Sequence, residues 1–146
     1  MECTVRWVGP DAGMSFIGES GTNHAVLMDG APEAGGRNLG PRPMEMVLIG
    51  TGGCTAFDVV MILKKGRHNV SDCVVKMTSE RASVDPKVFT TIHFHFVVSG
   101  HQLTASAVER AVKLSHEKYC SASIMLAHSV EMSHSFEIID TSLAPA

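Results

Sequence analysis

The stretch that decides the fold runs from residue 44 to residue 65 and reads MEMVLIGTGGCTAFDVVMILKK. Pro43 precedes it, Glu45 lies in its first turn, and Lys64 and Lys65 lie in its last turn. A proline at the first helical position and end charges of these signs suit an α-helix and its dipole. Apolar residues occur on nearly every side of the stretch, so it predicts a central helix that is buried all round.

This helix would be about 33 Å long, which is also enough to cross a bilayer. Its apolar character is interrupted by Asp58, three glycines, two threonines and a cysteine. A buried helix of a globular domain tolerates such residues better than a membrane span does. We therefore expect a core helix and no membrane partner.

Short β-type and helical patterns surround this helix. Turn residues separate the β-type runs, and a Gly- and Pro-rich loop at 29–43 precedes the helix. In the run at 88–99, Ile92, Phe94, Phe96 and Val98 alternate with polar residues, which is typical of a half-buried strand. The pattern indicates one α+β domain over residues 1–140, followed by a flexible tail at 141–146. The other expected elements are strands at 3–8, 14–18, 25–28, 70–80 and 130–139, a helix at 104–119 and a short helix starting near residue 120.

The composition limits the partners that the chain can have. Its net charge of −3 offers no basic field for nucleic acid. The first residues lack the basic segment and apolar stretch of a secretory signal, so we expect a cytoplasmic protein. Only 18% of the residues are charged and nine are methionine, which suggests more buried surface than one domain needs, as in a dimer.

The segment Gly52-Gly53-Cys54, in the middle of the predicted helix, is the first candidate for chemistry. Each glycine costs a helix about 1 kcal/mol relative to alanine, so a close approach to the backbone is expected there. Another helix crossing at the small residues would leave Cys54 as inert filler. A substrate reaching the sulfur would instead make Cys54 reactive, and the residues alone leave both readings open.

The other cysteines and the histidines give weaker signals. Cys3 and Cys73 lie in β-type runs and are expected to be packing residues, and no cysteine belongs to a CxxC motif. His93 and His95 share one strand face but lack further ligands nearby in the sequence, so no metal site is expected. Cys120 lies at the junction of two helices, where exposed amides would lower the pKa of its thiol.

Four segments together resemble the OsmC/Ohr-like family, in the branch related to YhfA. They are Gly40-Pro41-Arg42-Pro43-Met44-Glu45, Gly52-Gly53-Cys54, Asp58-Val59-Val60 and Glu117-Lys118-Tyr119-Cys120-Ser121. The order of elements agrees over the whole chain. The resemblance implies an α+β OsmC-like fold in which antiparallel sheets wrap around two central helices. It also implies an intertwined homodimer with two active sites at the subunit interface.

The same resemblance implies a thiol-dependent peroxidase that acts in oxidative stress defence. Cys54 would attack the O–O bond of a small-molecule hydroperoxide, and Cys120 would condense with the resulting sulfenic acid to form a disulfide. A dithiol reductant would then restore the pair. No metal, flavin or haem cofactor would be required.

The sequence departs from the family pattern around the reactive sulfur. In the peroxidases a glutamate directly follows the helix-opening proline and, with an arginine, surrounds this sulfur. Here the acid is Glu45, one position later, and Arg37 and Arg42 lie in the upstream loop without matching the family's spacing. Glu45, Arg37 and Arg42 are nevertheless the candidates for these two roles.

Two other classes of function fit the same residues. A non-enzymatic dimer could bind a small hydrophobic ligand in an apolar cleft, with both cysteines reduced and passive. A thiol redox sensor would form the Cys54–Cys120 disulfide and change shape without turning over a substrate.

Overall fold

The computed structural model describes residues 1–143. The chain forms two compact units, Met1–Ile49 and Gly50–Ala146. Residues 144–146 of the expected tail lie outside the described residues. Residues 141–143 form a short 3₁₀ turn, in which the Ser142 hydroxyl lies 2.7 Å from Nδ1 of His101.

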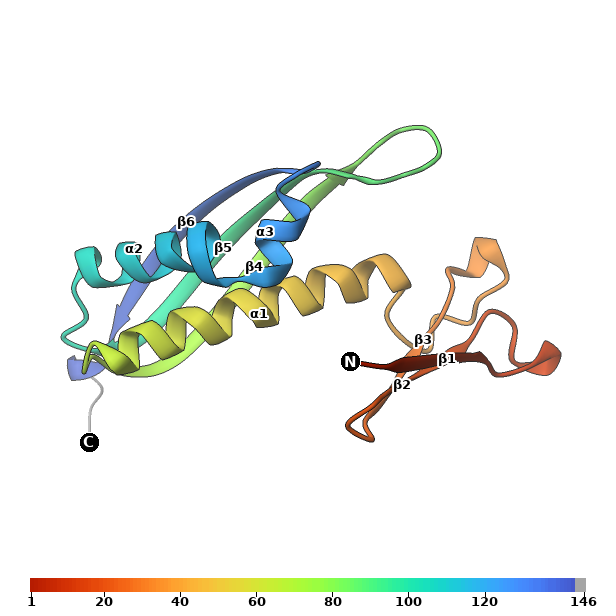
Figure 1. Ribbon diagram of the computed structural model, residues 1–146, viewed down its shortest axis with the longest axis horizontal. Coiled ribbons are helices and arrows are strands. Elements are labelled where there is room, and N and C mark those ends of the chain that lie inside the picture. Colours follow the sequence, from red (N-terminus) through yellow and green to blue (C-terminus); the bar gives the residue numbers. More distant parts are fainter. Residues whose placement is uncertain (144–146) are drawn as a thin grey trace. The chain divides into compact units, whose positions relative to one another are not determined.

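The first unit is built on a three-stranded antiparallel sheet (Figure 1). Its strands are β1 (Cys3–Trp7), β2 (Phe16–Ser20) and β3 (Ala25–Met28), joined in the order β1-β2-β3. The three predicted runs are thus confirmed, with the second shifted by two residues. Two 3₁₀ turns, Pro10–Ala12 and Pro32–Ala34, follow β1 and β3.

A buried carboxylate organises the loop that follows β3. Asp29 is only 1% exposed, and its side chain accepts backbone N–H groups from Gly30 at 2.7 Å, Leu39 at 3.0 Å and Arg37 at 3.2 Å. The bond from Leu39 is the largest cause that lowers the pKa of Asp29 below its ordinary value of 3.8, and it outweighs the opposing effect of burial. One side chain therefore ties together both ends of a ten-residue loop segment.

We expect the Asp29→Asn variant to be less stable than the wild type at neutral pH and less sensitive to acid. Because the pKa of Asp29 is lowered on folding, its carboxylate stabilises the fold above the unfolded pKa, and this contribution is lost as the pH falls through the folded pKa. The urea midpoint should fall by ~0.5–1 M in the variant at pH 7. Urea titrations from pH 7 down to the pKa region check this, and equal acid sensitivity of the two proteins would contradict it.

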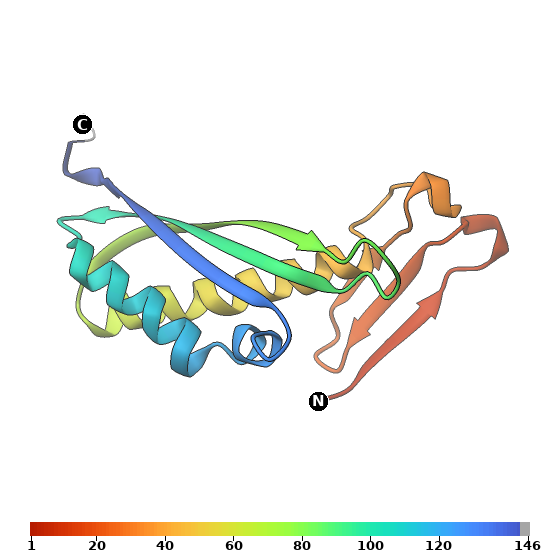
Figure 2. The ribbon, with the colours of Figure 1, turned by 90° about the horizontal axis from the view of Figure 1, so that it is seen from above.

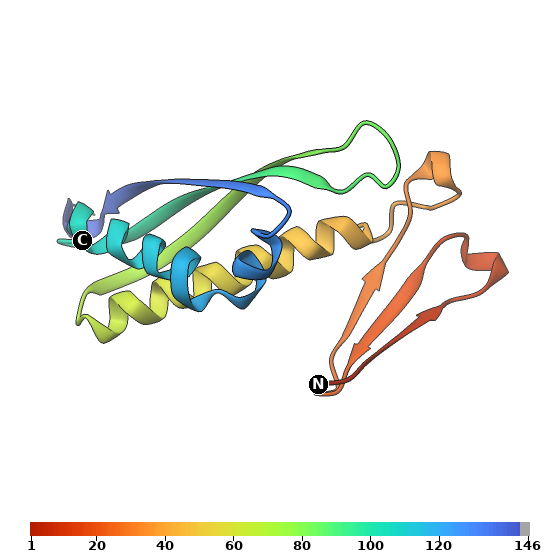
Figure 3. The same ribbon diagram turned by 45° about the horizontal axis from the view of Figure 1, so that its top comes forward.

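The second unit contains a mixed three-stranded sheet with helices along one face (Figures 1, 2 and 3). β4 (Asn69–Arg81) and β5 (Phe89–His101) form an antiparallel hairpin, and β6 (Glu131–Asp140) lies parallel to β5. The expectation of purely antiparallel sheets is therefore wrong for β6. The reason is the helical connection between β5 and β6, because a long crossover lets two strands run in the same direction.

The sheet buries the apolar face of β5, as its alternation predicts. Ile92, Phe94, Phe96 and Val98 are at most 1% exposed. Helix α1 (Pro43–Lys65) belongs to this unit from Gly50 onward, and the crossover begins with α2 (Ala105–Leu114). Their fully buried residues complete the core: Val59, Leu63, Val108, Ala111 and Val112.

The helix α1 is not buried all round, so that prediction is wrong for the single chain. Its buried residues lie on one stripe, namely Thr51, Gly52, Thr55, Val59 and Leu63. Phe57 on the same helix is 67% exposed. Among the described residues, α1 is the one helix long and apolar enough to cross a membrane by length and composition, and 28% of its most apolar window is buried. One such helix is weak evidence for a span, because a core helix passes the same test.

The predicted helix at 104–119 divides into two parts. After α2 the backbone widens into a π-helical turn, Ser115–Tyr119, and the N–H of Cys120 donates to the carbonyl of Ser115 at 2.8 Å. The short helix α3 (Ser121–Leu126) then begins, as expected. Single π-helical turns are rare and occur often at functional sites.

Candidate functional site

Three side chains from two elements of the second unit meet at one point. Cys54 and Asp58 are four residues apart on α1, so they share a helix face, and Cys120 caps the N-terminus of α3. The two sulfurs and a carboxylate oxygen of Asp58 all lie within 4.8 Å of one another. The structure thus brings together the two cysteines that the sequence singled out and adds an acid that the sequence had not placed beside both of them.

Both cysteines are free thiols, and they differ in exposure. Cys120 is fully buried, whereas Cys54 is partly exposed. A disulfide needs a sulfur–sulfur distance of about 2.05 Å, so bond formation requires the two sulfurs to move toward each other by less than 3 Å. Side-chain rotation supplies movements of this size. An oxidant arriving from solvent meets Cys54 first.

The surroundings of Cys120 shift the pKa of its thiol in the direction opposite to the one expected. The sulfur accepts the backbone N–H of Ser123 at 3.4 Å, as the helix junction predicts. Burial nevertheless raises the pKa of the Cys120 thiol, with Cys54 adding to the rise, and the bonds from Ser123 oppose it only in part. The prediction of a lowered pKa is therefore wrong, because desolvation outweighs the helix cap. Cys120 is a neutral thiol at pH 7.

A short hydrogen-bond network positions Asp58. The Ser115 hydroxyl lies 2.8 Å from the Thr55 hydroxyl and donates to Oδ2 of Asp58 at 3.2 Å. Thr55 and Ser115 are both fully buried. No local pattern predicts this network, because it joins the start of the π-helical turn to residues of α1 about 60 positions earlier in the chain.

A groove of about 770 Å³ lies between α1 and α2 and reaches this cluster through Asp58. Its lining includes the apolar side chains Phe57, Met61, Ile62, Leu63 and Leu114, and the ring of Tyr119. Lys65, His68 and Arg110 add basic groups to the lining. The groove is therefore mainly apolar, with basic side chains on part of its wall. The sequence did not predict which residues line it.

Glu45 and Arg42 interact with each other at the start of α1. A carboxylate oxygen of Glu45 accepts the backbone N–H of Arg42 at 2.8 Å, and the two side chains form an ion pair at 3.3 Å. The bond from the Arg42 N–H is the main cause that lowers the pKa of Glu45. This is half of a capping box, which stabilises a helix start.

Arg37, the other candidate, contacts loop residues of the first unit. Its guanidinium donates to the carbonyl of Asp11, and its backbone N–H donates to Asp29. Arg37, Arg42 and Glu45 all belong to the unit Met1–Ile49, and the two cysteines belong to the unit Gly50–Ala146.

The glycines beside Cys54 differ from each other. A Cβ on Gly52 would lie 2.5 Å from Cε of Met77 on β4, so here a side chain does approach the helix backbone closely. A Cβ on Gly53 would meet nothing within 4 Å among the described residues. The predicted close approach is therefore found at Gly52, but it comes from a half-buried methionine side chain and not from a second helix or a substrate.

Two histidines lie beside the core. The His116 ring stacks on His134 at 5.1 Å and meets Phe94 edge-on at 4.9 Å. Burial, and then the neighbouring His134, lower the pKa of His116 to about 4. His116 is thus neutral at pH 7 and half-buried beside the core.

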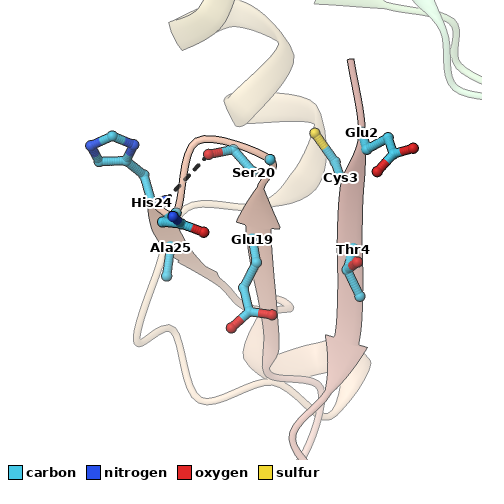
Figure 4. Close-up of a pocket in the computed structure, with 9 residues that line it drawn as sticks. Glu2, Cys3, Thr4, Glu19, Ser20, His24 and Ala25 are labelled. Atoms are coloured by element: carbon cyan, nitrogen blue, oxygen red, sulfur yellow. Dashed lines mark hydrogen bonds between the residues drawn. The ribbon is translucent and has the colours of Figure 1, made fainter.

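The first unit has a hollow of about 380 Å³ at one end of its sheet, shown in Figure 4. Glu2, Cys3, Thr4 and Glu19 line it, and the N–H of His24 donates to the Ser20 hydroxyl at 3.3 Å. Cys3 is exposed and has no second thiol in the lining. This hollow lacks the convergent groups of the cysteine cluster.

Comparison with known proteins identifies the family. The family model of OsmC-like proteins matches residues 35–135. The chain is 50% identical over 139 residues to protein YhfA of Escherichia coli K12, covering 95% of this chain and 98% of YhfA. A hypothetical protein from Aquifex aeolicus has a similar structure, with 28% identity and a TM-score of 0.76 over 95% of this chain and 97% of that one.

A more distant structure shares the fold. An organic hydroperoxide resistance protein OsmC from Legionella pneumophila is 14% identical, with a TM-score of 0.67 over 94% of this chain and 97% of that one. The family match, the half-identical relative and the α+β architecture of two three-stranded sheets agree with one another. The chain belongs to the family of OsmC-like proteins.

Proposed function

We propose that this protein reduces organic hydroperoxides through Cys54, with Cys120 as the resolving thiol. The observation that carries the proposal is the meeting of the two sulfurs, within 4.8 Å, beside a groove. The exposure difference supports this division of roles, because an oxidant would reach the partly exposed Cys54 before the fully buried Cys120.

The cycle has three balanced steps. The Cys54 thiolate attacks the terminal oxygen of the hydroperoxide, the O–O bond breaks, and after protonation the alcohol leaves while Cys54 becomes a sulfenic acid. The Cys120 thiol attacks this sulfur, the disulfide forms and water leaves. A dithiol reductant, expected in the cytoplasm, then reduces the disulfide by exchange and becomes a disulfide itself.

The lining of the groove supports an apolar substrate. Phe57, Met61 and Ile62 offer hydrophobic contact for the organic group of a hydroperoxide. A relative of the same fold carries the name organic hydroperoxide resistance protein. The leaving oxygen also needs a cation or donor, worth ~3 kcal/mol when preorganised. Arg42 and Arg37 are the candidates for that role, and Glu45 forms an ion pair with Arg42.

We also propose that the working form is a homodimer. Within a single chain α1 exposes Ile49 at 52% and Phe57 at 67%, and Met125 on α3 is 70% exposed. Exposed large apolar side chains of this kind are typical of surfaces that a second chain covers. A sedimentation measurement giving twice the chain mass supports this assembly.

Counting thiols tests the proposed cycle. Reduced wild-type protein, treated with one equivalent of cumene hydroperoxide, should lose two of its four thiols per chain. Peptide mapping should find a Cys54–Cys120 disulfide. The matched control is the Cys3→Ser/Cys73→Ser protein, which should go from two thiols to none.

Any other result of the thiol count favours a different function. An unchanged thiol count contradicts the cycle and favours a non-enzymatic module that binds a hydrophobic ligand in the groove. A disulfide that no dithiol can reduce favours a redox sensor instead.

A further inference from the structure

Cys54, Asp58 and Cys120 form a set of metal-binding side chains as well as a redox pair. Among residues 1–143, they are the one group of three His, Cys, Asp or Glu side chains whose ligand atoms all lie within 4.8 Å of one another. We propose that this cluster binds a thiophilic divalent cation, with Zn²⁺ as the type, and that the bound ion keeps both thiols reduced and unreactive. This inference goes beyond the peroxidase and does not depend on it.

The spacing of the three atoms fits zinc with little movement. Zinc lies about 2.3 Å from thiolate sulfur and about 2.0–2.2 Å from carboxylate oxygen, and its geometry is tetrahedral. Ligand atoms of such a site are therefore ~3.4–3.8 Å apart. The observed separations, no larger than 4.8 Å, require a contraction of at most about 1.4 Å per pair.

Neighbouring groups already orient the ligands. The Ser115 hydroxyl holds Oδ2 of Asp58 at 3.2 Å, and Ser115 is itself fixed by Thr55. The N–H of Ser123 points at the Cys120 sulfur from 3.4 Å. Hydrogen bonds of this kind from outer residues are a regular part of zinc sites, where they position the ligands and tune the metal.

The charges of the ion and its ligands nearly cancel in this site. Binding releases the two thiol protons to solvent, so two thiolates and one carboxylate surround a dication and leave a net charge of −1. Three protein ligands leave the fourth tetrahedral position for water, and Asp58 lies at the groove from which water enters. A thiolate that is bound to zinc has less electron density on its sulfur than a free thiolate, so it attacks a peroxide more slowly.

Metal binding by reduced protein, without peroxide, is the direct test. We expect one Zn²⁺ per chain in competition with a chromophoric zinc chelator under anaerobic conditions. Co²⁺ in place of Zn²⁺ should give sulfur-to-cobalt charge-transfer absorption and the visible bands of tetrahedral cobalt. This spectrum of the wild type needs no variant, so it holds even if a variant fails to fold.

Variants then identify the ligands. Cys54→Ser and Cys120→Ser should each weaken Zn²⁺ binding by at least ~100-fold, and Asp58→Asn by at least ~10-fold. The control protein Cys3→Ser/Cys73→Ser should bind Zn²⁺ as the wild type does. Circular dichroism checks that each variant is folded.

The results separate this site from the proposed peroxidase. Equal Zn²⁺ affinity in the wild type and in folded Cys54→Ser or Asp58→Asn would overturn the site, as would a cobalt spectrum without sulfur bands. Addition of one equivalent of Zn²⁺ should also slow alkylation of the two thiols by iodoacetamide. None of these measurements uses a peroxide, so a protein inert to hydroperoxides still confirms or refutes the metal site.

Discussion

Peroxide consumption by the Cys54→Ser variant should fall to the rate of a buffer blank. The serine hydroxyl is a far weaker nucleophile than a thiolate, and no other thiol of the second unit occupies the partly exposed position beside the groove. The change is nearly isosteric, so the fold should persist. A coupled assay with cumene hydroperoxide and a dithiol donor measures the loss.

The Cys120→Ser variant separates the two thiol roles. It should react once with peroxide at Cys54 and then stop, leaving a sulfenic acid that dimedone labels. Further peroxide should drive Cys54 to the sulfinic acid, because no neighbouring thiol captures the intermediate. Cys73→Ser is the matched control, since burial raises the pKa of Cys73 to about 11, and this variant should keep full activity. Full turnover by Cys120→Ser would contradict its role as resolving thiol.

The second large effect is a loss of stability when a core side chain of β5 is truncated. Phe94 on β5 is completely buried, and its ring meets the edge of His116 in the π-helical turn before Cys120. Phe94→Ala should lower the free energy of unfolding by ~3–5 kcal/mol, through lost apolar burial and the cavity left behind. Denaturant unfolding followed by circular dichroism measures this.

Val84→Ala is the control for that measurement. Val84 is 72% exposed in the connection between β4 and β5, so its truncation should change the free energy of unfolding by less than ~0.5 kcal/mol. A loss below 1 kcal/mol in Phe94→Ala would show that the sheet and helices repack around the gap.

Patterns within single segments predicted most of the fold. The alternation of Ile92, Phe94, Phe96 and Val98 identified the buried face of β5 without any knowledge of its neighbours. Pro43 and the terminal lysines of α1 marked both ends of that helix to within one residue. These features depend on local periodicity and on the helix dipole, which the sequence displays directly.

Features that depend on contacts between residues far apart in the sequence were not predicted. The parallel pairing of β6 follows from the crossover, and the one-sided burial of α1 follows from what covers it. Ser115, the first residue of the π-helical turn, donates a hydrogen bond to Asp58. No local residue pattern predicts such a turn. The raised pKa of Cys120 depends on burial by other elements, so the helix cap alone gave the wrong direction.

In the cluster of Cys54, Asp58 and Cys120, too, local patterns were informative and distant contacts were not. The sequence singled out Cys54 and Cys120 through glycines, a helix junction and a family resemblance, and the structure places their sulfurs together. Asp58 was visible as an acid four residues after Cys54, but its proximity to Cys120 requires the folded crossover. Glu45 is a candidate site residue by its place in the sequence, and the structure shows that it caps α1.

The sulfur of Cys120 can accept a hydrogen bond from the Ser123 amide or form a disulfide with Cys54, and the disulfide would weaken the hydrogen bond. In the reduced protein it accepts the Ser123 amide and so anchors the first turn of α3, a helix of only six residues. A sulfur that swings over to join Cys54 leaves that amide without its acceptor, and a helix so short has few other bonds to compensate. The proposed disulfide would therefore loosen the first turn of α3, and faster amide exchange at Ser123 in the oxidised protein would report this change.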